Sequence, residues 1–353
     1  MKQMLLRGIR GDQYTCLLLV LGTFMLSLFI HRSTDIPKTL WVYVTPRPTT
    51  GPSITMNYTG LPTHQTKPTT RHPLIPPYPH DYKFILNEPD KCKPEAPFLV
   101  ILVIGNANDY QARHAVRSTW GNESTVPGVS VIRLFLTGIA PRVTDRVQKM
   151  LEEESATFHD IIQQDFLDTY NNLTLKTLMG MEWVAKHCLN ASYVMKIDND
   201  MFLNVDFLVH NLLIPGIQVK RNYMSCYIVR NTGPLRNRAY KWYVPKEVYP
   251  RSKYPPYCSG PGYVLSGDLA KKIYDVAQTM QLINMEDSFI GLCMEALKLN
   301  LTIPPQGVFN GHNIKYDRCR FSSLITVHHY SPQRLMEIWP DFQSRNVSEC
   351  GTS

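Results

Sequence analysis

The chain has 353 residues, of which 44% are hydrophobic, and carries a formal net charge of +8 with a pI near 9.0. This length and apolar content allow at least one full-sized core and one or two domains. A basic chain suits nucleic acid, an anionic membrane or an anionic small molecule. Because it has neither a nucleic-acid-binding motif nor a dense basic run, we exclude nucleic acid as a partner.

The first predicted element is a membrane anchor. Tyr14 to Ile30 is an uncharged run of 17 residues, which as a helix spans roughly 25 Å. Basic residues precede it, so the positive-inside rule predicts a cytoplasmic tail at 1–13, an anchor at 14–30 and a lumenal remainder. The short span favours an early secretory membrane, here the Golgi, in single-pass type II topology. A cleaved signal peptide is disfavoured because no small-x-small site follows the run.

Two further features predict a lumenal protein. Six N-glycosylation sequons follow the anchor, at Asn57, Asn122, Asn172, Asn190, Asn300 and Asn346. Seven cysteines also follow it, an odd number that leaves at least one thiol without an internal partner. Their spacing matches no zinc site, and their pairing stays open.

A stem separates the anchor from the folded domain. Residues 31–80 contain ten prolines and eleven threonines, and no helical or strand periodicity continues through the prolines. Such a segment cannot bury enough apolar surface to offset its ordering entropy. The sequence therefore predicts an extended, disordered stem at 31–80 and a catalytic domain at 81–353.

Buried runs alternate with amphipathic segments in the domain, which predicts an α/β fold. We expect strands at Phe98–Ile104, Val131–Leu136, Asp160–Gln164 and Tyr193–Ile197. Helices are expected at Tyr110–Thr119, in a stretch ending with Glu152–Phe158, and at Leu173–His187.

Charged residues at two of these elements are candidate ligand contacts. Arg113 and Arg117 lie one helical turn apart, which suits a clamp on a nucleotide or its phosphates, although an exposed basic helix face has the same spacing. Asp198 and Asp200 follow the strand that ends at Ile197, where α/β sheets bind ligands. Two carboxylates there suit Mg²⁺ or Mn²⁺ bound to a diphosphate, but a solvated turn is also common. Lys196 offsets their negative charge.

Four blocks in this order and spacing resemble the signature blocks of the β-1,3-galactosyltransferase family (glycosyltransferase family 31). They are Arg113–Gly121, Lys196–Asn204, Tyr257–Tyr263 and Glu286–Asp287, and the resemblance runs from about Asp81 to Tyr330. It implies a GT-A type fold, a Rossmann-like mixed sheet in a single nucleotide-binding domain. It also implies an inverting transfer from a UDP-α-sugar to a β-1,3 linkage.

The resemblance also implies a metal site. Asp200 corresponds to a direct metal ligand, and Asp198 to a residue that reaches the nucleotide or, through water, the metal. His328 stands where related enzymes bring a histidine to the same ion, and the adjacent His329 leaves that assignment open. Oxygen ligands with one imidazole favour Mn²⁺, with Mg²⁺ possible.

By the same resemblance, Asp287 is the catalytic base. Its neighbour Glu286 would orient the acceptor or raise the pKa of Asp287 by like-charge repulsion. The pair also suits the N-terminus of a helix, where acidic residues are favoured, and both interpretations hold together.

An acceptor subsite is expected around the third block. Gly260 and Gly262, in a loop at 259–263, let the backbone approach a sugar closely, and Trp242 and Tyr257 offer rings for stacking. A tight turn would explain the two glycines equally well, and packing in the hydrophobic core would explain the two aromatic residues. Pro261 departs from the family pattern, as do Asn199 and the stretch 288–290, which leaves an inactive relative as one alternative.

The predicted activity moves galactose from UDP-galactose to the 3-hydroxyl of a terminal GlcNAc on a protein or lipid glycan. One alternative is a β-1,3-N-acetylglucosaminyltransferase that uses UDP-GlcNAc, because related enzymes share the same blocks. Another is a metal-dependent glycan-binding membrane protein without turnover, which leaves Asp287 and the arginine pair unexplained. An oligomer is possible.

Overall fold

The computed structural model describes residues 71–141, 145–344 and 350. The predicted tail and anchor, and the predicted stem up to residue 70, lie outside these residues. Within the described ranges, no helix combines the length and the apolar character needed to cross a bilayer.

A seven-stranded mixed sheet forms the centre of the domain, in the order β1-β4-β3-β2-β5-β8-β7. The strands β4, β3, β2 and β5 are parallel, whereas β1, β8 and β7 join antiparallel. Every residue of β2 is buried, because helices cover both faces of a parallel sheet. The bounds are β1 Phe84–Leu86, β2 Leu99–Ile104, β3 Val131–Ile139, β4 Ile161–Leu167, β5 Tyr193–Asp198, β7 Met224–Val229 and β8 Tyr257–Ser266. The predicted α/β class and the four predicted strands are confirmed.

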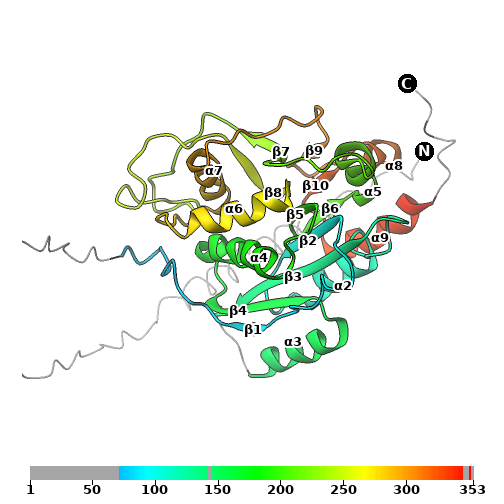
Figure 1. The fold of residues 1–353 in the computed structure, drawn as a ribbon, viewed down its shortest axis with the longest axis horizontal. Coiled ribbons are helices and arrows are strands. Elements are labelled where there is room, and N and C mark those ends of the chain that lie inside the picture. The colour runs from blue at the N-terminus through cyan, green and yellow to red at the C-terminus, as the bar shows by residue number, and fades with distance from the viewer. Residues whose placement is uncertain (1–70, 142–144, 345–349, 351–353) are drawn as a thin grey trace, which may run out of the picture. The chain divides into compact units, whose positions relative to one another are not determined.

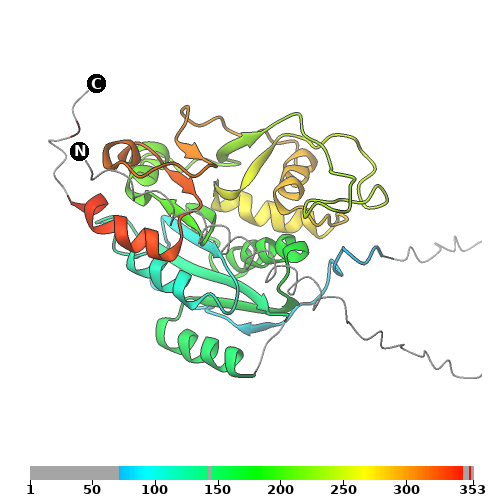
Figure 2. The same cartoon turned by 180° about the vertical axis from the view of Figure 1, so that it is seen from behind.

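Helices cover the two faces of this sheet and create two cores. On one face lie α4 (Leu173–His187), α6 (Gly267–Ala277) and α7 (Glu286–Ala296). On the other lie α2 (Tyr110–Ser118) and α9 (Pro332–Gln343), which run side by side in Figure 2. The helix α3 (Asp145–Phe158) adds Leu151 to this second core. Figure 1 shows the resulting layers, with α4 and α6 in front of the sheet.

A second, three-stranded sheet has the order β6-β10-β9, from β6 (Met201–Leu203), β10 (Thr326–His328) and β9 (Phe309–Asn310). β10 runs antiparallel to β6, and His328 pairs with Met201. Because β6 begins directly after the turn at the end of β5, this pairing brings His328 beside that turn. Short helical segments complete the region, namely Tyr170–Asn172 before α4, α5 (Val205–Phe207), a π-helical segment at Leu208–Leu213 and α8 (Arg318–Ser322).

Two features differ from the sequence prediction. The glycine-containing segment 259–263 is not a loop but part of β8. Pairing between β7 and β8 shifts there, so that residues 259–262 of β8 face only Tyr227 of β7. Pro261 lies in this bulge, where its missing N–H costs no ladder bond to β7. Residues 71–80 were predicted to be stem, yet Ile75 is only 5% exposed in the core.

Three disulfides are present in the described residues, Cys92–Cys188, Cys226–Cys258 and Cys319–Cys350. Cys293, buried in α7, is free. The odd cysteine count of the sequence therefore corresponds to a free buried thiol. Burial raises its pKa to about 12, so this thiol stays protonated at neutral pH.

Candidate active site

The carboxyl end of β5 brings together the charged residues that the sequence predicted. Lys196 is buried, and its ammonium donates to Asp198 Oδ1 at 2.7 Å and to the Gly260 carbonyl at 2.6 Å. Glu286 Oε2 lies 3.8 Å from the same ammonium. The lysine thus links β5, β8 and the start of α7, three elements far apart in the chain.

Glu286 and Asp287 form the first turn of α7. The Tyr263 hydroxyl donates to Glu286 Oε1 at 2.6 Å, and the Ser288 amide donates to Asp287 Oδ1 at 2.7 Å. Glu286 is therefore held in place by β8, whereas Asp287 is half-buried. The predicted helix N-terminus is confirmed. We call Lys196, Asp198, Glu286 and Asp287 the carboxylate cluster.

The pKa values of the three carboxyl groups in this cluster are all raised. Burial raises the pKa of Asp198, of Glu286 and of Asp287, and the Lys196 ammonium opposes that rise in each case. The charge of Asp287 further raises the pKa of Glu286. Charge repulsion by Glu286 was predicted to raise the pKa of Asp287, but burial is the largest cause of the rise. A carboxylate with a raised pKa is a better proton acceptor.

A possible metal site lies next to this cluster. Asp200 Oδ2 is 3.4 Å from His328 Nε2 and 3.8 Å from His329 Nδ1, and one atom from each side chain lies within 4.8 Å of the others. Burial alone would raise the pKa of Asp200, but the hydrogen bond and charge of His328 outweigh burial and lower it. This set of one carboxylate and two imidazoles fits a divalent metal.

The three residues of the metal site come from two strands of the small sheet and its flanks. Asp200 precedes β6, His328 ends β10, and the amide of Tyr330 donates to the Asp200 carbonyl at 2.7 Å. His329 adopts φ 63°, a left-handed backbone that turns its ring onto His328. Asp198 was predicted to share this ion, but its carboxylate contacts Lys196; its role as a ligand stays a prediction.

The side chains of Arg113 and Arg117 are only 2% and 8% exposed and do not face solvent. Arg113 donates to Glu154 at 2.9 and 2.6 Å and to the carbonyls of Asn106 and Ala107. Arg117 donates to Asp160 at 2.8 Å through two nitrogens and to Glu154 at 2.6 Å. The alternative prediction of an exposed basic helix face is thus wrong, because both guanidinium groups form ion pairs with the buried carboxylates of Glu154 and Asp160. Their nucleotide contact stays a prediction. Arg133 also pairs with Asp160. We call Arg113, Arg117, Arg133, Glu154 and Asp160 the arginine cluster.

Aromatic residues stand on the α7 side of the site. Tyr257 packs against α7 and accepts a hydrogen bond from Thr232, while Trp242 is 44% exposed in the segment between β7 and β8. Tyr170, just before α4, was not predicted. Burial raises the pKa of Tyr170 to about 12, and the negative charge of Asp287 adds to the rise. No local pattern marks Tyr170, because its role depends on the packing of distant segments.

The two predicted glycines take different positions. A Cβ on Gly260 would lie 3.6 Å from Asp287 Oδ2 and from Glu286 Oε2, in van der Waals contact with both carboxylates. Gly262 pairs with Ile197 of β5 and faces the core, where Met195 is the nearest neighbour of an added Cβ. Gly260 therefore lies at the site, and Gly262 supports the sheet beneath it.

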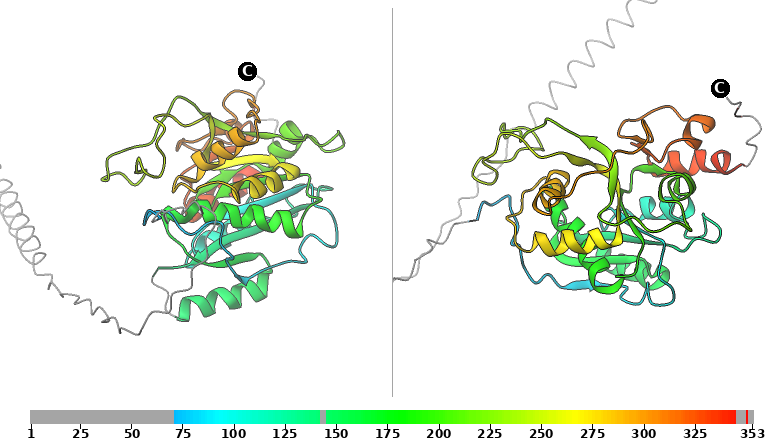
Figure 3. Two further views of the ribbon diagram at one scale, coloured as in Figure 1. Left: turned by 60° about the vertical axis from the view of Figure 1, so that its left-hand side comes forward. Right: turned by 45° about the horizontal axis from the view of Figure 1, so that its top comes forward.

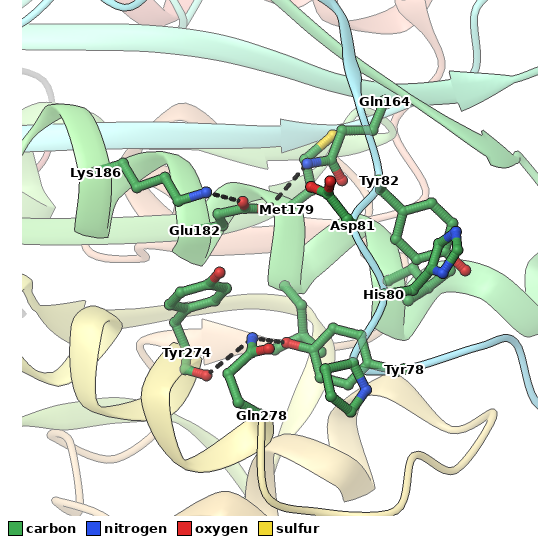
Figure 4. A pocket seen from close by; sticks show the side chains of 13 residues that line it. Tyr78, His80, Asp81, Tyr82, Gln164, Met179, Glu182, Lys186, Tyr274 and Gln278 are labelled. Carbon is green, nitrogen blue, oxygen red and sulfur yellow. Dashed lines mark hydrogen bonds and ion pairs between the residues drawn. The ribbon is translucent and has the colours of Figure 1, made fainter.

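A cavity of about 380 Å³ lies elsewhere, between α4, α6 and the segment before β1. Figure 4 shows Tyr78, Gln278 and Tyr274 along one side and Glu182 with Lys186 along the other. None of the predicted site residues lines it, and its glutamate is already paired with Lys186 and with the Gln164 amide. The chemistry of the molecule is concentrated at the end of β5 instead.

Comparison with known proteins identifies the family of the chain. The galactosyltransferase family model matches residues 111–305. The chain is 44% identical over 278 residues to β-1,3-galactosyltransferase 2 of Mus musculus, covering 78% of this chain and 66% of that protein. This chain belongs to the galactosyltransferase family. The family resemblance drawn from the sequence is thus confirmed, and the non-catalytic alternative is not favoured.

Other relatives extend the match. β-1,3-galactosyltransferase 1 of Mus musculus is 44% identical over 272 residues, covering 77% of this chain and 82% of that protein. The alignments to the galactosyltransferase 2 relatives span just under two thirds of their length. A solved galactosyltransferase, LgtC with donor and acceptor sugar analogs, covers 70% of this chain and 98% of its own at 11% identity and a TM-score of 0.37. That likeness carries no structural argument.

Proposed function

We propose that this family member is an inverting β-1,3-galactosyltransferase of GT-A type, which moves galactose from UDP-galactose to the 3-hydroxyl of a terminal GlcNAc. The observation that carries the proposal is the convergence of the carboxylate cluster with Asp200 and the two histidines at one strand end. A proton acceptor and a possible metal site stand side by side there, as glycosyl transfer from a nucleotide diphosphate requires. The names of the relatives support galactose as the sugar.

The residues of this chain divide the reaction between them. Asp287 accepts the proton of the acceptor hydroxyl while the oxygen of that hydroxyl forms a bond to the anomeric carbon of the donor sugar. The bond from that carbon to the diphosphate breaks, and UDP leaves with the electron pair. Glu286, held by Tyr263 and Lys196, orients the acceptor beside Asp287. A divalent metal, which we take to be Mn²⁺ by its donor set, would be held by Asp200 and His328 and would neutralise charge on the departing diphosphate.

The proposed setting is the Golgi lumen. The predicted anchor at 14–30, the stem and the sequons support a type II membrane protein whose catalytic domain meets glycoproteins and glycolipids. Disulfides in the domain fit an oxidising compartment.

The test uses the full-length chain with UDP-Gal, UDP-GlcNAc and UDP-GalNAc, a GlcNAc-terminated acceptor, and Mn²⁺ or EDTA. We expect metal-dependent transfer from UDP-Gal. Asp200→Ala should lose both transfer and metal-dependent UDP binding, whereas Asp287→Asn should lose transfer, by about 10²–10⁴ in kcat, and retain UDP binding. Transfer from UDP-GlcNAc alone would make the chain an N-acetylglucosaminyltransferase, and failure to bind UDP would refute the proposal.

A further inference from the structure

The segment between β7 and β8 carries an unusual excess of positive charge. Residues 230–253 contain seven arginines and lysines and a single acidic residue, Glu247. In Figure 3 this yellow-green segment loops out from the body of the domain. Two of the cations have structural partners. Arg236 donates to the carbonyls of Val244, Tyr249 and Arg251, and Arg251 pairs with Glu295.

The remaining cations of the segment have no carboxylate within ion-pair distance among the described residues. They are Arg230, Arg238, Lys241, Lys246 and Lys253. Arg236 ties the segment together through its three carbonyl contacts, and a bridge between Leu235 and Tyr243 closes it. The unpaired charges therefore stand on an ordered support and repel one another, an arrangement that favours an anionic ligand.

Contacts place this segment beside the proposed base. The Asn284 amide donates to the Tyr243 carbonyl at 3.0 Å and to Asn171 Oδ1 at 3.2 Å, and Asn284 lies three residues before Asp287. These bonds join the segment to the start of α7 and to the residues just before α4. Lys241 Nζ lies 5.4 Å from the centre of the Tyr170 ring and 4.9 Å from the centre of the Trp242 ring. One ammonium is thus held against two aromatic rings at the α7 side of the site.

Resting on the proposed transferase function, we propose that residues 230–253 form a subsite for an anionic substituent of the acceptor glycan, a sulfate ester, with Lys241 as its central contact. The aromatic rings of Tyr170 and Trp242 stack on a sugar, and the ammonium pairs with the anion. The diphosphate of the donor is a different ligand, because the possible metal site lies on β6 and β10 rather than on this segment. The acceptor, by contrast, must reach Asp287.

Electrostatics explains why such a subsite is needed. The carboxylate cluster sets three carboxylates, Asp198, Glu286 and Asp287, against the single Lys196 ammonium, which gives it an excess of negative charge. An anionic acceptor would be repelled from it. Unpaired cations on the approach offset this repulsion and increase the rate of encounter, an effect that salt screens.

The test measures kcat and both KM values of the full-length chain with UDP-Gal and three acceptors: a neutral GlcNAc-terminated disaccharide, its terminal 6-sulfate and its penultimate-sugar sulfate. At low salt we expect at least one sulfated acceptor to be preferred about fivefold or more in kcat/KM, through its own KM. The preference should shrink in 0.5 M salt. Lys241→Ala should reduce the ratio to about one, and Lys241→Arg should restore most of it.

The matched control is Lys149→Ala, an exposed lysine on α3 that should keep both the activity and the preference. Equal kcat/KM for all three acceptors would overturn the anion subsite while leaving the transferase function intact. A Lys241→Ala variant that raises the KM for UDP-Gal without changing the acceptor ratio would also overturn it. Absence of transfer to any acceptor would instead refute the proposed function.

Discussion

The arginine cluster and the carboxylate cluster are both groups of buried and half-buried charged side chains, but they differ in how the charges are paired. In the arginine cluster, three guanidinium groups share Glu154 and Asp160, and Arg113 also binds backbone carbonyls. In the carboxylate cluster, a single ammonium serves Asp198 and Glu286, with Asp287 beside them.

The pKa values follow this difference in opposite directions. Burial alone would raise the pKa of Asp160, but the hydrogen bond from Arg117 and the charges of Arg133 and Arg117 outweigh burial and lower it. In the carboxylate cluster burial prevails, and the pKa values of Asp198, Glu286 and Asp287 rise. An excess of cations keeps a buried carboxylate ionised and structural, whereas an excess of carboxylates prepares it to accept a proton.

The largest effect is expected from breaking the arginine cluster. Asp160 is fully buried, so Asp160→Asn leaves Arg133 without a carboxylate and Arg117 with Glu154 alone, and should cost about 3–5 kcal/mol of the free energy of unfolding. Because the pKa of Asp160 is lowered, its contribution is present above the unfolded pKa and disappears as the pH falls through the folded one. Denaturant unfolding at pH 7 measures it. The control Glu153→Gln, at an exposed site on α3, should change the free energy of unfolding by less than about 0.5 kcal/mol. A loss under about 1 kcal/mol for Asp160→Asn would show that the arginine cluster does not stabilise the fold.

The raised pKa values of the carboxylate cluster predict how the activity falls on the acid side of its pH–rate profile. Because burial raises the pKa of Asp287, it becomes protonated, and unable to accept a proton, at a higher pH than an ordinary aspartate. With saturating metal, kcat/KM should fall about tenfold per pH unit below that raised pKa. A pH–rate profile from pH 4 to 8 measures the limb. An acid limb near the ordinary aspartate value would contradict the proposed environment of the base.

A smaller effect is expected from the support of Glu286. Tyr263→Phe removes the hydroxyl that donates to Glu286 at 2.6 Å, without changing the shape of the buried ring. We expect kcat/KM to fall about three- to tenfold, which corresponds to about 0.7–1.4 kcal/mol, the net contribution of a typical hydrogen bond. Steady-state kinetics measures this loss, and Tyr110→Phe, an exposed tyrosine on α2, serves as the control. Unchanged kinetics would remove Tyr263 from the site.

The smallest expected effect has the opposite sign to that of Asp160→Asn. The ionised form of Asp287 is disfavoured in the folded protein, because its pKa is raised. Asp287→Asn should therefore increase the free energy of unfolding at pH 7.5 by about 0.5–1 kcal/mol while transfer is lost. The gain should shrink as the pH falls through the raised folded pKa and should vanish below the unfolded pKa, where the wild-type side chain is protonated in both states. Destabilisation at pH 7.5 would mean that the two clusters do not differ as described.

The sequence by itself determined the local elements and the positions of the chemistry. Buried runs marked β2, β3, β4 and β5, and the helix predicted at Leu173–His187 has the observed bounds of α4. Asp198 and Asp200 were recognisable as a short motif at the end of a strand, and Glu286 and Asp287 through the resemblance of their block to the family. Periodicity and the spacing of short motifs are local properties of the sequence.

Only the tertiary structure decided which of these residues meet. Lys196 contacts Glu286 because β8 runs antiparallel to β5 and presents Gly260 and Tyr263 beside it. His328 reaches Asp200 because β10 pairs with β6. Arg113 and Arg117 face carboxylates at residues 154 and 160 rather than solvent, because α2 packs beside α3 and β4. Such pairings depend on strand order and on how distant segments close over a common core, and no local pattern of residues encodes them.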